Sequence, residues 1–158
     1  MKLLRLYLLA LAAAWSLAVV PAHADQGYPG DGMVVLETEK TFKQLVEDLR
    51  ASIRAENMLL VTRASASAGA RGRGITIPGN MVVGVFRNDY ALRMLEASVP
   101  AGIEAPVRFY LTEEADGTAT LTYRKPSAVF APYGSEQLDV MARELDIVFS
   151  DIARGAVR

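Results

Sequence analysis

The sequence predicts an α+β fold with two layers, in which helices pack on one face of a mostly antiparallel sheet. Segments with strand-like alternation come in consecutive pairs, and the pair at 107–111 and 118–123 flanks the hairpin turn Glu114-Ala115-Asp116-Gly117. Two longer stretches, 42–55 and 136–154, carry apolar residues at helical spacing. The predicted order, β-α-β-β-α-β-β-α, favours an antiparallel sheet over a doubly wound parallel one.

The first 24 residues are typical of an export signal. Lys2 and Arg5 provide a positive start, and residues 6–20 form an uncharged apolar run. Pro21 then breaks the run, and Ala22-His23-Ala24 offers small residues at the cleavage positions. An uncleaved anchor helix is the alternative, but a membrane span needs about 20 apolar residues. We therefore expect a signal peptide over 1–24, cleavage after Ala24, and a periplasmic or secreted protein.

Cleavage would remove His23, the single histidine of a chain that has no cysteine. The remaining residues then lack the imidazole and thiol groups of Ser-His-Asp and Cys-His nucleophiles and of most transition-metal sites. The signal also takes two of the 17 basic residues and none of the 18 acidic ones, so the net charge moves from −1 to −3. We expect no cofactor, no metal and no nucleic-acid partner. No later segment is apolar and long enough to span a membrane, so none is expected to after cleavage.

The first half of the remaining chain begins with turn-forming residues, 25–32, which predict a flexible leader. A single α+β domain is then expected over 33–155, with a first strand at 33–36. Thr41 and Gln44 have capping-box spacing at the start of a helix over 42–55. Asn57 follows as a candidate left-handed stop.

The middle of the chain predicts a strand at 58–63, a flexible small-residue loop at 65–74 and a short extended piece at 75–77. Residues 81–86 are nearly all apolar, which is typical of an interior strand. A second helix is expected over 89–98, capped by Asn88 and stopped by Pro100, with Ala91, Leu92 and Leu95 facing inward.

The hairpin alternates cleanly between two faces. Val107, Phe109 and Leu111 share one face, and Arg108 and Tyr110 share the other. On the partner strand, Leu121 and Tyr123 lie opposite a row that contains Thr122 and Arg124. Ser135 is expected to cap the last helix, 136–154, and Gly155 to end it.

Arginines and tyrosines supply the candidate binding residues. The glycine-rich loop lacks the Lys-Ser/Thr of a P-loop, so it is either a solvated loop or part of a weak anion site built from Arg63, Arg71 and Arg73. The polar face of the hairpin is either solvated surface or a ligand or subunit surface, because tyrosine and arginine are favoured in binding patches. The candidate ligand-binding residues are Arg63, Arg71, Arg73, Arg108, Tyr110, Tyr123 and Arg124.

Carboxylate groups leave an enzymatic alternative open. Acidic residues cluster at 37–39, 113–116 and 136–139, but none of these clusters has calcium-loop spacing. Pairs of carboxylates perform acid–base catalysis in glycosidases, yet their pairing depends on long-range contacts that a sequence does not give. We assign no catalytic residue and no metal ligand.

Residues 77–126 resemble the bacterial family named domain of unknown function 302. The resemblance rests on the apolar strand Met81–Asn88, on Ala101-Gly102-Ile103, on the turn Asp116-Gly117 and on the exit Tyr123–Pro126. It extends over about 33–153 and implies a two-layer α+β domain, often dimeric, with no established activity. Members often carry a histidine where this chain has Ser65-Ala66-Ser67.

These observations predict an exported, non-catalytic module that binds a small anionic ligand or a protein partner. A carboxylate-dependent hydrolase-like enzyme and a purely structural homodimer are the alternatives. The ligand and the physiological process are not encoded in any motif of the chain.

Overall fold

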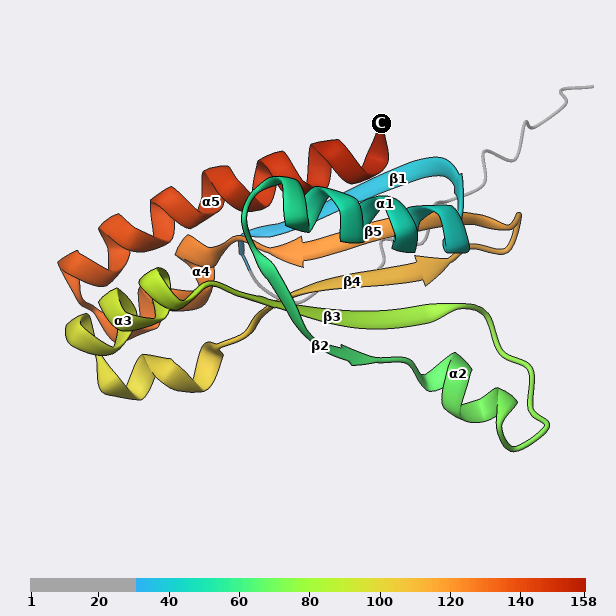
Figure 1. The fold of residues 1–158 in the computed structure, drawn as a ribbon, viewed down its shortest axis with the longest axis horizontal. Helices are drawn as coiled ribbons and strands as arrows, with labels where there is room; N and C mark the ends of the chain where they lie inside the picture. Colours follow the sequence, from blue (N-terminus) through green and yellow to red (C-terminus); the bar gives the residue numbers. More distant parts are fainter. Residues whose placement is uncertain (1–30) are drawn as a thin grey trace, which may run out of the picture.

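The computed structural model describes residues 31–158, in which five strands and several helices form one sheet-and-helix unit (Figure 1). The predicted signal peptide and residues 25–30 of the predicted leader lie outside the described residues. The strands are β1 (Met33–Thr41), β2 (Leu59–Ala64), β3 (Asn80–Phe86), β4 (Val107–Glu113) and β5 (Thr118–Arg124). The helices are α1 (Phe42–Ala55), α2 (Ala66–Arg71), α3 (Asn88–Ala97), α4 (Pro126–Phe130) and α5 (Glu136–Val157), with short 3-10 segments η1 (Val99–Glu104) and η2 (Ala131–Tyr133).

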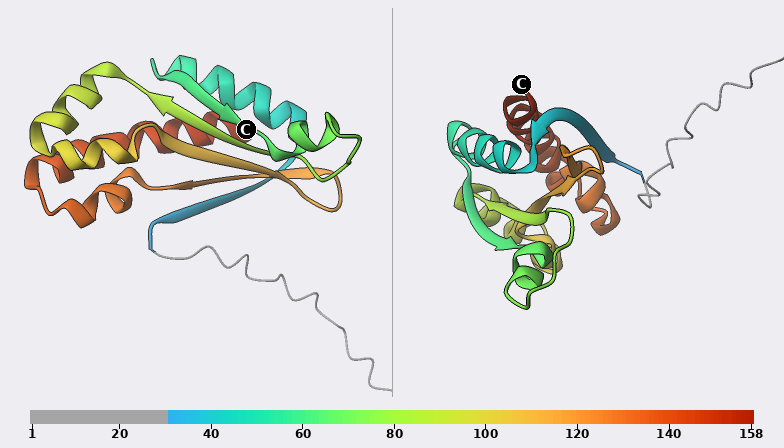
Figure 2. Two further views of the ribbon diagram at one scale, coloured as in Figure 1. Left: turned by 90° about the horizontal axis from the view of Figure 1, so that it is seen from below. Right: turned by 90° about the vertical axis from the view of Figure 1, so that its right-hand side faces the viewer.

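The sheet has the order β1-β5-β4-β3-β2, and every pair of neighbours is antiparallel. Helices α1 and α5 lie together on one face of it (Figures 1 and 2). The α+β prediction, with helices on one face of a mostly antiparallel sheet, is therefore confirmed. Residues 81–86 form an interior strand, also as predicted.

An aromatic cluster joins the sheet to α5. The ring of Phe149 stacks on that of Phe109 with 4.7 Å between centroids, and Tyr123 packs against both rings. Phe109 and Phe149 have no exposed side-chain surface, and Tyr123 is 5% exposed. Aliphatic side chains of α1, α5 and the two hairpin strands complete this core, which includes Leu45, Leu49, Ile53, Leu111, Leu121, Leu138, Met141 and Ile152.

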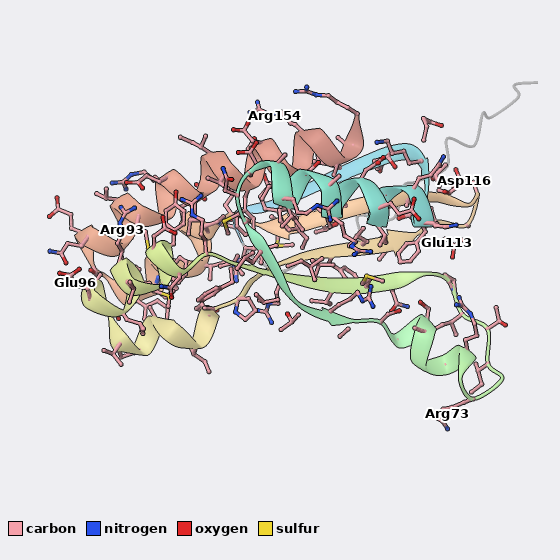
Figure 3. All side chains as sticks on the ribbon, viewed as in Figure 1. Arg73, Arg93, Glu96, Glu113, Asp116 and Arg154 are labelled. Atoms are coloured by element: carbon pink, nitrogen blue, oxygen red, sulfur yellow. The ribbon has the colours of Figure 1, made fainter. Side chains whose placement is uncertain are left out.

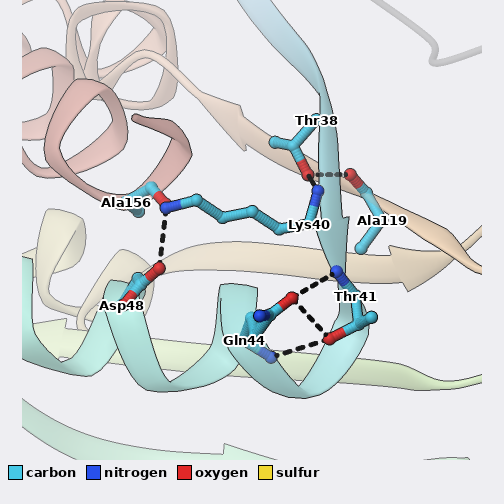
Figure 4. Close-up of polar contacts among 7 residues, drawn as sticks. All are labelled: Thr38, Lys40, Thr41, Gln44, Asp48, Ala119 and Ala156. Atoms are coloured by element: carbon cyan, nitrogen blue, oxygen red, sulfur yellow. Dashed lines mark hydrogen bonds and ion pairs between the residues drawn. The ribbon is translucent and has the colours of Figure 1, made fainter.

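The corner between β1 and α1 follows its local sequence signals. The Thr41 side chain accepts a hydrogen bond from the Gln44 backbone, and the Gln44 side chain accepts one from the Thr41 backbone, so the predicted capping box is present (Figure 4). The Lys40 ammonium donates to Asp48 at 2.7 Å and to the backbone oxygen of Ala156 at 2.8 Å. That lysine thereby ties β1 to α1 and to the C-terminal end of α5, where a cation is favourable.

Two other local predictions are confirmed. Asn57 adopts the left-handed conformation, with φ of 55°, directly after α1. The hairpin turn has Gly117 at φ of 87°, and Asp116 accepts hydrogen bonds from both the amide and the hydroxyl of Thr118. These hydrogen bonds lower the pKa of the Asp116 carboxyl.

Several connections were predicted incorrectly. The stretch expected to be a flexible loop contains α2, because Ser65 caps it by accepting from the Ala68 amide and Asn80 accepts from the Ala66 amide. The segments η1, α4 and η2 also lack predicted counterparts. These segments are short, so the apolar periodicity that identifies a longer helix is not visible in their sequence.

The ends and faces of two helices also differ from the prediction. Arg87, not Asn88, occupies the capping position of α3, and it makes no capping hydrogen bond. Leu92 and Leu95, expected to face inward, are 61% and 43% exposed, and Met94 is the buried residue of α3. Helix α5 continues through Gly155, where an added Cβ would lie 2.7 Å from the Ser52 hydroxyl. This glycine serves close packing on α1 rather than helix termination.

None of the helices within residues 31–158 combines the length and the apolar character that crossing a membrane requires.

The packing of Phe149 gives a stability prediction. Phe149→Ala is expected to lower the free energy of unfolding by about 3–5 kcal/mol, because it removes a fully buried ring and leaves a cavity. Ile147→Ala lies on the same helix at a side chain that is 64% exposed, so it should change stability little. Urea denaturation of both variants measures the difference, and equal effects would contradict this account of the core.

Candidate functional site

The face of the sheet opposite α1 and α5 presents two rows of side chains that run across the strands. The strand pairings place Val35, Thr122, Tyr110 and Val82 in one row. The neighbouring row contains Met33, Arg124, Arg108 and Gly84. The predicted hairpin face of Arg108, Tyr110, Thr122 and Arg124 is therefore present, and its members come from the interior strands β4 and β5.

Arg108 and Arg124 are adjacent cations on neighbouring strands. Since Phe109 pairs with Tyr123, the next position of the same register places Arg108 opposite Arg124. Directly opposed residues on antiparallel strands have Cβ atoms about 5 Å apart, where like charges destabilise the sheet. Among residues 31–158 neither guanidinium forms an ion pair; the Arg124 Nε donates only to the backbone oxygen of Asp31, at 3.3 Å. No carboxylate among the described residues therefore neutralises either guanidinium.

These two arginines line a surface hollow of about 410 Å³. The sheet forms its floor, and α4, η1 and η2 contribute its wall. Polar groups of the lining come from Arg108, Arg124, Tyr110, Thr122 and Glu104. Apolar lining comes from Met33, Val82, Val107, Ala128, Val129 and Pro132. The hollow thus combines two cations with an apolar surface, and the Glu104 carboxylate also contributes to its lining.

Hydrogen bonds hold the wall of this hollow in place. The amide and the hydroxyl of Ser127 both donate to the Asp146 carboxylate, at 2.9 and 2.6 Å, which fixes the start of α4 against α5. The Tyr133 hydroxyl donates to Glu104 at 2.9 Å and joins η2 to η1. This hydrogen bond raises the pKa of the Tyr133 phenol, because the carboxylate favours the protonated donor.

Tyr123 contributes to the lining of the hollow, but its ring lies on the other face of the sheet, within the aromatic cluster. Burial raises the pKa of its phenol, and the negative charge of Asp146 raises it further. We assign Tyr123 to the core rather than to ligand contact, since alternate residues of a strand face opposite sides.

The other three predicted arginines lie elsewhere. Arg63 is on β2 and lines a second hollow together with Arg50 and Arg54 of α1, two residues that the sequence analysis did not select. Arg71 ends α2, and Arg73 lies at the far tip of the following loop (Figure 3). The structure therefore distributes the predicted arginines over three places and brings Arg108 and Arg124 together.

The acidic clusters give no catalytic arrangement within residues 31–158. No aspartate or glutamate in this part of the chain is buried; the buried polar residues are Ser67, Thr120 and Thr122. Glu113 accepts from the Gly79 amide at 2.5 Å, so it closes a turn beside β3. No group of three or more acidic or histidine side chains with the geometry of a metal site occurs among these residues.

Two comparisons with known proteins give the same family. The family model described as "Domain of unknown function DUF302" matches residues 34–152. A crystal structure of an uncharacterised conserved DUF302 protein from Bacillus stearothermophilus superposes with a TM-score of 0.72. The match covers 82% of this chain and all of the other, at 15% sequence identity. Because the identity is low, this likeness shows a shared fold and nothing about function. The search of curated proteins gave no match.

The wall of the hollow yields a titration prediction. Glu104→Gln removes the negative charge next to Tyr133, so the pKa of the Tyr133 phenol should fall toward its ordinary value. A titration followed by NMR with labelled tyrosine ring carbons measures this change. Glu96→Gln, an exposed substitution on α3, is the matched control. An unchanged Tyr133 titration in Glu104→Gln would contradict the hydrogen bond.

Proposed function

The chain belongs to the family described as Domain of unknown function DUF302, and from this premise we propose that it is a non-catalytic binding module. Its ligand is a small anion that carries an apolar body, and the hollow of Arg108 and Arg124 is the site. The single observation that supports this function most directly is the pair of adjacent arginines without an ionic partner among the described residues.

The charge of the ligand follows from those arginines. A guanidinium presents its donors in a planar fork that suits carboxylate and phosphate groups. An anion between Arg108 and Arg124 would relieve their repulsion and form charge-assisted hydrogen bonds with both. Tyr110 lies in the adjacent row, where its hydroxyl group suits a further polar contact.

The apolar residues that line the hollow indicate that the ligand also has an apolar part. Val82 and Met33 on the sheet, with Val129 and Pro132 on the wall, offer apolar surface next to the cations. Binding sites for small molecules usually combine a mainly apolar lining with few polar groups that fix orientation. An alkyl or aryl group next to the carboxylate or phosphate would use both parts of the hollow.

The compartment and the assembly state belong to the same proposal. The export signal predicted at 1–24 would deliver the module to the periplasm or to the exterior. No aspartate or glutamate among the described residues is buried, which supports binding over the hydrolase alternative, because acid–base catalysis by carboxylates usually requires a pKa that burial raises. Self-association into a homodimer remains a prediction of the family resemblance, and light scattering on the purified protein tests it.

The ligand proposal is tested with phenyl phosphate as the probe. It should raise the melting temperature of the protein, and benzyl alcohol, which has a similar apolar body and no charge, should raise it less. Arg108→Gln/Arg124→Gln should lose the phenyl phosphate effect. In low salt without the probe this variant should be as stable as the parent or more stable, because it removes like-charge repulsion.

Arg71→Gln/Arg73→Gln is the control, since it removes the same charge from the exposed loop. Its melting temperature should respond to phenyl phosphate as the parent does. Loss of the response in Arg71→Gln/Arg73→Gln alone would indicate that the anion binds at the loop that carries these arginines. An unchanged response in Arg108→Gln/Arg124→Gln would overturn the proposal.

A further inference from the structure

Strand β2 forms an edge of the sheet within residues 31–158, where β3 is its single neighbour. Its outer backbone groups are therefore available for pairing with another strand. Its side chains are also accessible: Leu59 is 60% exposed and Val61 is 48% exposed. Five of its six residues are exposed. An accessible edge with apolar side chains is suited to the addition of a further strand.

Three arginines lie beside this edge. Arg50 and Arg54 are one turn apart on α1, and with Arg63 of β2 they line a hollow of about 530 Å³. Like charges at this helical spacing destabilise a helix. Within residues 31–158 none of the three forms an ion pair. The cluster is thus a concentration of positive charge next to the outer edge of β2, which has no strand neighbour among the described residues.

A bulge in β2 directs Arg63 toward the other two. The register between β2 and β3 shifts between Leu60 and Thr62. Leu60 pairs with Val85 and, after the shift, Arg63 pairs with Val83, so both residues share the face on which α1 lies. Without the extra residue Arg63 would point to the opposite face, because side chains alternate along a strand.

We propose that this edge binds an extended acidic segment of a partner protein, which adds to the sheet beside β2. Main-chain hydrogen bonds to β2 would hold the segment, and its carboxylates would face Arg50, Arg54 and Arg63. Alternate side chains of an added strand point to the same face. The segment that fits therefore carries acidic residues at every second position, with apolar residues between them that meet Leu59 and Val61.

A second copy of this chain is a poorer occupant. Two β2 strands paired about a two-fold axis would form a continuous sheet with both α1 helices on the same side. The arginine clusters of the two copies would then face each other across the seam, where like charges repel. Charge complementarity favours an acidic segment instead.

The proposal is independent of the ligand proposed above, because the two arginine groups lie in separate hollows. The probe is a labelled eight-residue peptide that alternates glutamate and valine, and its binding is followed by fluorescence anisotropy at low salt. A peptide with glutamine for glutamate should bind about tenfold more weakly. A version with N-methyl groups on alternate residues should also lose affinity, because it cannot pair as a strand.

Arg50→Gln/Arg54→Gln should weaken binding of the acidic peptide about tenfold, because it removes two positive charges that would face the carboxylates. Both side chains are exposed, so the variant should still fold. Arg71→Gln/Arg73→Gln is matched in charge and should bind as the parent does. Arg108→Gln/Arg124→Gln should also bind as the parent does, which separates this proposal from the ligand proposal. Circular dichroism checks that each variant is folded.

Hydrogen exchange provides the second readout. The peptide should slow exchange of β2 amides and leave those of β1, at the other edge of the sheet, unchanged. Absence of binding up to about 1 mM peptide would overturn the proposal. Equal binding of the glutamine peptide, or unaltered affinity in Arg50→Gln/Arg54→Gln, would also overturn it. Protein dimerisation that protects β2 without peptide would assign the edge to a second copy.

Discussion

The contact of Phe149 with Phe109 and Tyr123 determines which face of the sheet is buried. Since strand side chains alternate, fixing these rings under α5 directs Arg108 and Tyr110 to the opposite face. A one-residue slip of the hairpin would exchange the two sets and bury a guanidinium. The buried aromatic cluster and the cationic hollow are therefore two consequences of the same register.

The wall of that hollow depends on contacts between segments that are distant along the chain. Helix α4 is held through Ser127 by Asp146, and η1 is held to η2 by the bond between Glu104 and Tyr133. The long helix α5 thus has two roles: its apolar side forms the core, and Asp146 positions the segment that borders the site. The geometry of the hollow is coupled to the packing of α5 rather than to the hairpin alone.

The sequence predicted those features that depend on neighbouring residues. The capping box at Thr41, the left-handed Asn57 and the hairpin alternation all follow from local chemistry and are present. The buried side of α3 was predicted incorrectly, because Leu92 and Leu95 have helical spacing but α3 packs through Met94. Local patterns also did not predict that Arg50, Arg54 and Arg63 line one hollow, because this depends on how α1 crosses the sheet and on the bulge in β2.

The distribution of ion pairs within residues 31–158 separates two kinds of arginine. Arg87, Arg93 and Arg154 each have a carboxylate partner: Asp89, Glu144 and Asp151, respectively. Exposed pairs of this kind contribute little to stability, so they are readily gained or lost. Among the described residues, the guanidinium groups that line the two hollows nevertheless have no such partner, although acidic residues are numerous. Each hollow groups at least two like charges, an unfavourable arrangement that an external anion would reverse. This contrast between the two kinds of arginine supports the two binding surfaces that we propose.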